Sequence, residues 1–316
     1  MRLVRVLPSL APRPAPPRED YNVDAIRALA FAPDATDLIV LGRFALARWA
    51  LDDARPRWRR AHAARWGGHA TFTPDGAALY TIGDDERLVE RDPATGAERR
   101  CLDPACHVTA ALVVSADGRD LAWAGSSVPG NPGGYSRSAA RLWDVATAAR
   151  RWEWSGPDWC SASGLAIAAD DVRVVAGRGR AVALARADGA ERAHHALVDG
   201  GQIHAIRRGR AIVASGETPT RAWLQLRTGG TLALRRELAI AAAEPVAIDP
   251  IGRFAAVTQG RSEVAIVSLA RMQAIETLRL ADPDLDRPTA LALRAGLLAV
   301  GTVGGQVHVL APRALA

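Results

Sequence analysis

The chain has 316 residues, of which 49% are apolar and 23% are charged. This length allows one all-β unit with a sizeable core. The sequence has no run of about 18 apolar residues, so it offers no apolar segment that could cross a membrane. All 40 basic residues are arginine, yet the net charge is only +6, which gives little support for a nucleic-acid partner. Abundant alanine and arginine without lysine indicate the coding bias of a GC-rich, bacterial genome.

The first residues predict a short strand followed by a stiff connection. Residues 3–7 have the composition of a β-strand, and Arg5 interrupts the apolar run that a signal peptide needs. Prolines crowd residues 8–17, which favours an extended segment. The three cysteines are too few, and odd in number, for a disulfide framework, so we expect a cytoplasmic protein.

An apolar strand followed by a tight turn recurs along the chain about every 40 residues. The copies begin at Phe31, Phe72, Val114, Ile167, Ile206, Ile248 and Leu293. Proline, aspartate and glycine follow the strand in several copies, and tight turns require these residues. Copies at this period predict an all-β fold, because helical spacing fits none of the segments.

The clearest copy, residues 110–154, contains four short strands joined by turns. Its third strand ends on Trp143-Asp144, and its fourth runs over residues 150–154. Four such strands form one antiparallel sheet. Third strands of similar composition lie at residues 46–49, 88–92, 222–226, 264–267 and 307–310.

This strand order and the Trp143-Asp144 dipeptide resemble a blade of the WD-repeat β-propeller family. Gly68-His69, before a first strand, matches the family's other signature. The resemblance implies one domain over residues 1–316, a seven-bladed β-propeller with four antiparallel strands per blade. Little chain follows residue 310, so we expect residues 3–7 to close the last blade as its outer strand. The expected blades cover residues 26–62, 68–102, 107–155, 163–198, 202–238, 245–280 and 289–311 with strand 3–7.

In this family, a histidine, a serine or threonine of the second strand, a turn aspartate and the tryptophan can form a buried hydrogen-bonded tetrad. The second blade offers His69, Thr81 and either Asp84 or Asp85, but Arg91 stands where the tryptophan would be. The resemblance therefore implies an incomplete tetrad. We expect a structural role for His69, not a catalytic one.

A metal-dependent hydrolase centred on the channel is one alternative. His69, His107 and His204 all precede first strands, but they lie at different distances from the turn motif. Metal ligands must converge to about 2 Å, which this mismatch opposes. Cys101 and Cys106 lack the second pair of a zinc site. We therefore predict no metal, no cofactor and no enzymatic activity.

Arginine pairs recur on the predicted outer strands. They are Arg59-Arg60, Arg99-Arg100, Arg150-Arg151 and Arg235-Arg236. Such a belt can protect sheet edges from pairing, or it can bind nucleic acid or another acidic surface. Acidic residues such as Glu98 and Glu153 are interleaved, which favours edge protection. Nucleic-acid binding remains the alternative function.

Aromatic and arginine residues in the links between blades predict where a partner protein docks. The loop between the second and third strands of the third blade is about ten residues longer than its counterparts, and long loops are often functional. In the family's geometry this loop and the links lie on one face. Exposed aromatic residues beside arginine are typical of a binding hot spot, although they can also fill the joints between blades. The predicted partner-binding residues of this non-catalytic scaffold are Trp66, Tyr135, Asp158, Trp159, Arg178 and Arg180.

Overall fold

The fold is all-β, as the sequence predicts. The computed structural model describes residues 2–8, 25–53, 55–62, 64, 68–83, 85–106, 109–126, 137–156, 162, 164–168, 170–176, 180–196, 202–207, 211–218, 221–228, 233–242, 245–281 and 287–315. Within these ranges the strands form four-stranded antiparallel sheets. The one helical element described is a short 3-10 helix, η1 (Arg313–Leu315).

The first three sheets in the chain each follow sequence order. The β2–β5 sheet contains β2 (Ile26–Phe31), β3 (Asp37–Gly42), β4 (Ala45–Ala50) and β5 (Pro56–Ala61). The β6–β9 sheet contains β6 (His69–Phe72), β7 (Leu79–Ile82), β8 (Leu88–Arg91) and β9 (Glu98–Asp103). The β10–β13 sheet contains β10 (Thr109–Val114), β11 (Asp120–Ser126), β12 (Ser138–Asp144) and β13 (Arg150–Ser155).

Three further sheets repeat this order. The β14–β17 sheet contains β14 (Gly164–Ile167), β15 (Asp171–Ala176), β16 (Arg180–Ala185) and β17 (Glu191–Ala196). The β18–β21 sheet contains β18 (Gln202–Arg207), β19 (Ala211–Thr218), β20 (Arg221–Thr228) and β21 (Leu234–Ile240). The β22–β25 sheet contains β22 (Val246–Ile248), β23 (Phe254–Thr258), β24 (Glu263–Ser268) and β25 (Gln273–Arg279).

The remaining sheet combines the two ends of the described chain. It contains β26 (Pro288–Arg294), β27 (Leu297–Thr302), β28 (Val307–Ala311) and β1 (Arg2–Leu7). β1 pairs antiparallel with β28, with Arg5 opposite Val309 and Leu7 opposite Val307. Leu7 is fully buried in the cluster that also contains Ile26. Strand 3–7 thus lies beside strand 307–310, where the sequence analysis puts it.

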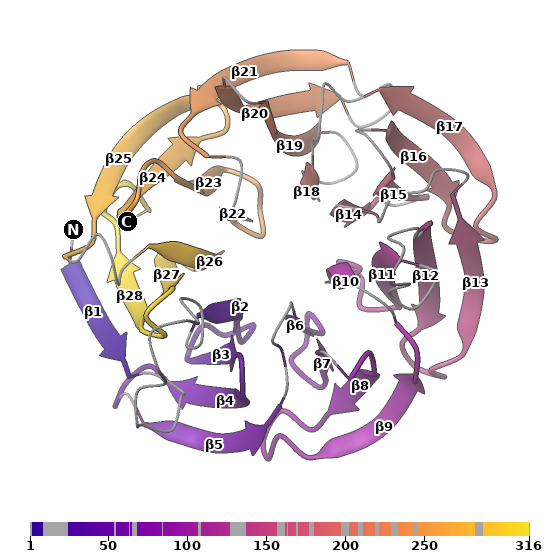
Figure 1. Ribbon diagram of the computed structural model, residues 1–316, viewed down its shortest axis with the longest axis horizontal. Coiled ribbons are helices and arrows are strands. Elements are labelled where there is room, and N and C mark those ends of the chain that lie inside the picture. The colour runs from indigo at the N-terminus through magenta and orange to yellow at the C-terminus, as the bar shows by residue number, and fades with distance from the viewer. Residues whose placement is uncertain are drawn as a thin grey trace, which may run out of the picture.

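The sheets are arranged around a common centre (Figure 1). The first strand of each sheet lies innermost, and the fourth strand lies outermost. Each first strand contacts the first strand of the next sheet, and β26 contacts β2. This arrangement is consistent with a β-propeller-like fold.

Side-chain hydrogen bonds explain the tight turns between first and second strands. Thr73 Oγ1 donates to Asp75 Oδ1 at 2.6 Å, and Ser115 Oγ donates to Asp117 Oδ1 at 2.5 Å. The next residue in each turn is a glycine with a positive φ; Gly118, for example, has a φ of 71°. Aspartate caps the turn backbone and glycine adopts the left-handed conformation without strain.

Burial differs between the middle and the edge of each sheet. All six residues of β3 are buried, whereas in β5 only Trp58 is buried. A middle strand is covered on both faces by neighbouring sheets, so it is largely apolar, and a polar residue such as Asp37 is buried there in ion pairs. The outer strand faces solvent on one side and carries the charged residues.

A recurring contact, which we name the edge latch, joins outer strands to the next sheet. One outer-strand side chain donates a hydrogen bond to a carbonyl in the turn that follows the next sheet's third strand. These bonds run from Trp58 Nε1 to Pro93 O (2.8 Å), Arg100 Nη2 to Val145 O (2.9 Å), Trp152 Nε1 to Arg186 O (3.1 Å), Arg236 Nη1 to Ala270 O and Arg5 Nε to Leu51 O (3.3 Å). At β25 the direction is reversed, because Ala314 N donates to Glu276 Oε2 at 2.9 Å.

The edge latches occupy one register position. Each side chain lies opposite the third-strand residue that comes just before a shift in register, as Trp58 lies opposite Arg48 and Arg5 opposite Val309. In β17 this position holds Ala193, which is too short to reach the next sheet. Because Arg5 of β1 makes the same contact as the outer strands, β1 is equivalent to them.

Candidate functional site

Four of the first strands carry a β-bulge near their start, and two of them, β2 and β26, belong to neighbouring sheets. In β2 the register shifts between Ile26 and Ala28, so Arg27 is the extra residue. In β26, Thr289 is extra in the same way. A bulge redirects the side chain that it carries. Thr289 Oγ1 donates to Ile26 O at 2.7 Å and thereby joins the two sheets beside Arg27.

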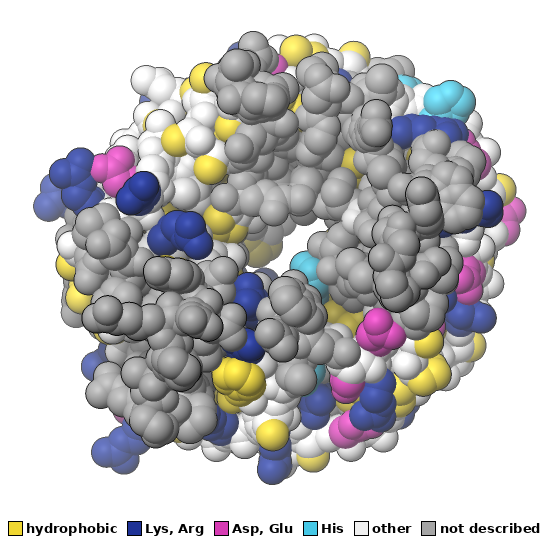
Figure 2. All heavy atoms as spheres, viewed as in Figure 1, with side chains coloured by type: hydrophobic (Ala, Val, Ile, Leu, Met, Phe, Trp, Pro, Cys, Tyr) yellow, Lys and Arg dark blue, Asp and Glu magenta, His cyan; other side chains and the backbone are white. Residues whose placement is uncertain are grey.

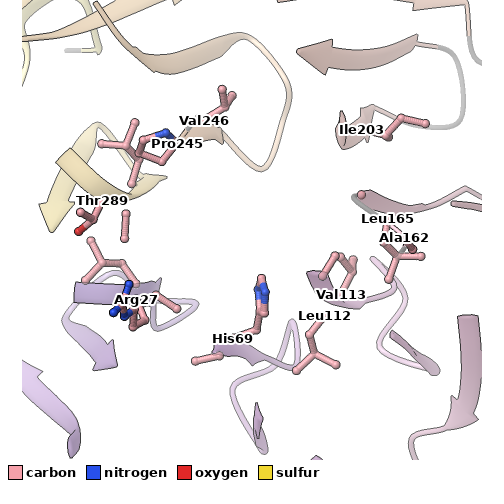
Figure 3. Close-up of a pocket in the computed structure, with 17 residues that line it drawn as sticks. Arg27, His69, Leu112, Val113, Ala162, Leu165, Ile203, Pro245, Val246 and Thr289 are labelled. Carbon is pink, nitrogen blue, oxygen red and sulfur yellow. The ribbon is translucent and has the colours of Figure 1, made fainter. Parts of the chain in front are cut away.

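These residues lie at a cavity of about 590 Å³ at the centre of the ring of first strands. Figure 3 shows the His69 ring projecting from β6 into this space, with Arg27 and Thr289 together at one side. The remaining wall is built largely from aliphatic side chains of the first strands. They include Leu29, Leu112, Leu165, Ile203, Val246 and Leu291.

The ionisable side chains among the described lining residues of the cavity are basic. Among the described lining residues, Arg27 and His69 are basic and none is acidic. A guanidinium remains cationic at every physiological pH. An apolar wall with a few polar groups is the usual form of a ligand site. The cavity is therefore the best-formed candidate site in the described part of the chain.

A second feature lies on the face where the first strands begin. Figure 2 shows this face, with a hollow at its centre and arginine and histidine side chains at the margin. The β3–β4 turn presents Phe44, which is 47% exposed, with the Arg43 guanidinium 4.9 Å from its ring centroid. His62 N donates to Phe44 O at 3.1 Å, and Ala64 N donates to Arg43 O at 2.8 Å. These bonds fix the turn against the link after β5.

The sequence analysis did not identify Arg43 and Phe44. The turn is only two residues long, and its composition gives no period or motif. The sequence did contain one indication of an exposed site here. A phenylalanine in a tight turn has no strand neighbours against which its ring can pack. An exposed aromatic residue beside arginine has the composition of a binding hot spot.

Of the predicted partner-binding residues, Arg180 is the one that falls within the described ranges. It begins β16 instead of lying in the turn, and its Nη2 is 2.9 Å from Glu191 Oε1 on β17. Strand direction places it on the same face as Phe44, because both lie where a third strand begins. Trp66, Tyr135, Asp158, Trp159 and Arg178 lie outside the described residues.

The residues considered for the tetrad form a different arrangement. Arg91 Nε donates to Thr81 Oγ1 at 2.9 Å, so the guanidinium contacts the second-strand hydroxyl. His69 is half-buried and lines the central cavity, whereas a tetrad histidine would be enclosed between sheets. Asp85 is exposed, and Asp84 lies outside the described residues.

The described residues contain no group of three or more histidine, cysteine, aspartate or glutamate residues that could hold a metal ion. The side chains of His107 and His204 lie outside the described part of the structure. Cys101 is an exposed free thiol and Cys106 a buried one. Burial raises the pKa of the Cys106 thiol well above its usual range, which suppresses the nucleophilic thiolate.

The arginine pairs lie on the outer strands β5, β9, β13 and β21, and many of their cations contact the protein itself. Arg99 pairs with Asp92 at 2.7 Å. Arg151 pairs with Asp144 at 2.5 Å and with the buried Asp120 at 3.3 Å. Arg100 and Arg236 form edge latches. Cations held by carboxylates and carbonyls are less available to external phosphates.

Within the described residues, no helix is both long enough and apolar enough to cross a membrane. Comparison of the sequence with protein-family models finds no match. Comparison with curated proteins also finds none. Functional assignment therefore depends on the geometry above.

Proposed function

We propose that the chain is a seven-bladed β-propeller of the WD-repeat type, closed by its N-terminal strand. It acts in the cytoplasm of a bacterium as a non-catalytic platform for another protein. The partner docks on the face that carries Arg43 and Phe44, to which Trp66, Tyr135, Asp158, Trp159, Arg178 and Arg180 are assigned.

The closed ring is supported by contacts between the ends of the chain. Thr289 Oγ1 bonds to Ile26 O, and Arg5 bonds to Leu51 O in the following sheet. The Arg5 bond repeats the edge latch made between sheets that are consecutive in sequence, and the Thr289 bond joins the first strands β26 and β2. A ring held in this way provides a rigid surface, which lowers the entropic cost of binding.

The docking face is supported chiefly by Phe44. Its ring is 47% exposed, the Arg43 guanidinium lies 4.9 Å from its centroid, and two backbone hydrogen bonds hold the turn that carries it. A pre-positioned aromatic ring loses little conformational freedom on binding and buries a large apolar area. Binding of nucleic acid through the arginine pairs is less well supported, since Arg99 and Arg151 are held in ion pairs with aspartates.

A pull-down from the native host identifies the partner, and its affinity for variants then tests the proposal. Phe44→Ala should weaken binding about tenfold or more, with an unchanged melting temperature. Trp159→Ala and Tyr135→Ala should also weaken it. Leu234→Ala is the matched control, because Leu234 is 51% exposed on the outer strand β21.

A different result would locate the site on the outer strands. If Phe44→Ala and Trp159→Ala leave the affinity intact while Arg59→Glu with Arg60→Glu abolishes it, the docking face is wrong. Loss of that binding on raising salt from about 50 to about 200 mM would then indicate a polyanionic partner.

A further inference from the structure

We propose that a pocket on the face opposite Phe44 binds an acidic peptide segment of a partner protein and takes up one large apolar side chain of that segment. This pocket, the turn pocket, lies where the turns that follow the first strands β2, β22 and β26 meet, and it has a volume of about 280 Å³. Its lining includes Ile251, Arg253, Phe254, Leu293, Arg294 and Leu315. Phe44 lies where the first strands begin, so the inference goes beyond the docking face proposed above and does not depend on it.

The β22–β23 turn differs from the corresponding turns at one exposed position. In the β6–β7 and β10–β11 turns this position holds Asp75 and Asp117, which accept backbone N–H groups of the turn. Here it holds Ile251, which is 51% exposed and lines the pocket. Asp249 caps this turn, since Phe254 N donates to its Oδ1 at 2.6 Å. The turn is thus capped without Ile251, whose apolar side chain extends the pocket wall to the surface.

The rest of the wall is built from apolar groups of separate elements. Leu293 of β26 and Leu315 of η1 belong to the same apolar cluster as Phe254, and all three line the pocket. Gly296 lets η1 approach closely, because a Cβ there would lie 3.3 Å from the Leu315 carbonyl oxygen. A volume of about 280 Å³ lies at the lower end of ligand sites, which begin at about 300 Å³, so it suits a single side chain. An aliphatic group fits this wall better than a sugar, whose hydroxyls would lose water without gaining partners.

Two arginines beside this apolar wall select the charge of the segment. The exposed Arg253 guanidinium lies 5.5 Å from the Phe254 ring centroid, a contact that uses none of its N–H donors. Arg294 donates through Nε to Pro33 O at 2.9 Å, which leaves its Nη groups for another acceptor. Among the described residues, neither guanidinium forms an ion pair. The lining carboxylate of Asp249 is bonded to the backbone, so carboxylates of a partner fit the two cations.

In another pocket of the described structure, arginines are already neutralised by the protein's own carboxylates. It lies between the β10–β13 and β14–β17 sheets and has a volume of about 500 Å³. Arg186 forms ion pairs there with Asp117 and Asp120, and Arg192 pairs with Asp171 at 3.0 Å. An acidic segment entering that pocket would compete with these carboxylates. The comparison favours the turn pocket as the place for an external carboxylate.

Titration of the full chain with three capped heptapeptides, followed by ligand-observed NMR, tests the inference. The first peptide has a leucine between two runs of three glutamates, and it should bind. With serine in place of the leucine, the affinity should fall about tenfold or more, because the apolar anchor is lost. With lysine in place of every glutamate, binding should be abolished. Failure of the first peptide to bind, or equal affinities of the leucine and serine peptides, would overturn the proposal.

Variants locate the peptide within the molecule. Ile251→Asp introduces the residue type of the corresponding turns, so it should fold normally, yet its carboxylate should abolish binding of the acidic peptide. Arg253→Gln and Arg294→Gln should each weaken binding about tenfold. Arg261→Gln is the matched control, because Arg261 is an exposed arginine of the same sheet in the β23–β24 turn, on the other face. Unchanged affinity of Ile251→Asp, or an equal loss in Arg261→Gln, would place the peptide elsewhere and contradict the proposal.

Discussion

Arg91 shows how one position in the repeat can hold chemically different donors. It aligns with Trp49 and Trp143, and its guanidinium bonds to the Thr81 hydroxyl. In the β10–β13 sheet, Trp123 stands where Thr81 would be. The indole nitrogens of Trp49 and Trp143 accordingly have no hydrogen-bond partner among the described residues. Of these two sheets, one has the hydroxyl and the other the tryptophan, so neither contains both of these tetrad members of WD-repeat propellers.

Two turn aspartates after the third strand have strongly lowered pKa values. The Arg151 guanidinium, followed by the Thr147 backbone, lowers the pKa of Asp144 to about 2. The Arg99 guanidinium and the Thr95 backbone do the same for Asp92. A carboxyl group with a depressed folded-state pKa stabilises the fold above its unfolded pKa near 4. That contribution is lost as the pH falls toward 2.

Melting temperatures across the acid range check this linkage. Asp144→Asn should melt below the wild type at neutral pH, and the difference should shrink between about pH 4 and pH 2. Asp92→Asn provides the matched second case. A difference that stays constant down to pH 2 would show that the carboxylate charge contributes nothing.

At the scale of elements, the edge latch joins the sheets through chemically different side chains. Trp58 and Trp152 also pack on the turn glycines Gly96 and Gly189, whose positive φ brings the backbone against the indole. A Cβ at Gly189 would lie 2.7 Å from Trp152, so a larger residue there would displace the ring. Arginine makes the carbonyl contact without this packing.

Substitution at Trp152 separates the contribution of ring packing on Gly189 from that of the hydrogen bond to the Arg186 carbonyl. Trp152→Ala should lower the free energy of unfolding by about 3–5 kcal/mol, because the cavity and the lost hydrogen bond add. Trp152→Arg should lose less, by about 1 kcal/mol or more, since Arg100 reaches the equivalent carbonyl in the preceding sheet. Urea unfolding measures both. If the two variants are equally unstable, the carbonyl contact does not contribute.

The strands were predictable because their signals are local. Alternating or continuous apolar runs and turn residues such as Asp117 and Gly118 specify a strand pair within a dozen residues. The edge latches were not predictable, since each connects residues at least 34 positions apart and uses no constant residue type. The bulge at Arg27 was missed for a related reason. A bulge is a property of the pairing between two strands, so it cannot be found from the spacing of residues along one strand.

The candidate site illustrates the same limit. Link residues such as Trp66 stand out by composition, whereas the cavity residues Arg27, His69 and Thr289 come from three sheets and form no motif. Their proximity follows from the ring, which no single repeat encodes. Phe44 was missed because one exposed phenylalanine has no periodic context.

At the scale of the whole molecule, β1 completes the sheet that contains the C-terminal strands. Deleting residues 2–7 should expose the β28 edge, remove the buried Leu7 and lower the melting temperature in one cooperative transition. Leu3→Ser is the control, because Leu3 is 51% exposed and should tolerate the change. Addition of the 2–7 peptide should partly restore the transition. An unchanged melting curve after the deletion would mean that β1 is not needed for the ring.

The pairing of β1 with β28 also sets an order on synthesis by the ribosome. β1 is translated first and β28 last, so at about 5–20 residues per second the first strand waits tens of seconds for its partner. During that interval the sheets between them can form one after another, while β1 remains an unpaired edge with Leu7 exposed. The nascent chain therefore carries an aggregation-prone strand until β28 has been synthesised, and a chaperone that holds β1 early in translation would raise the yield of folded protein.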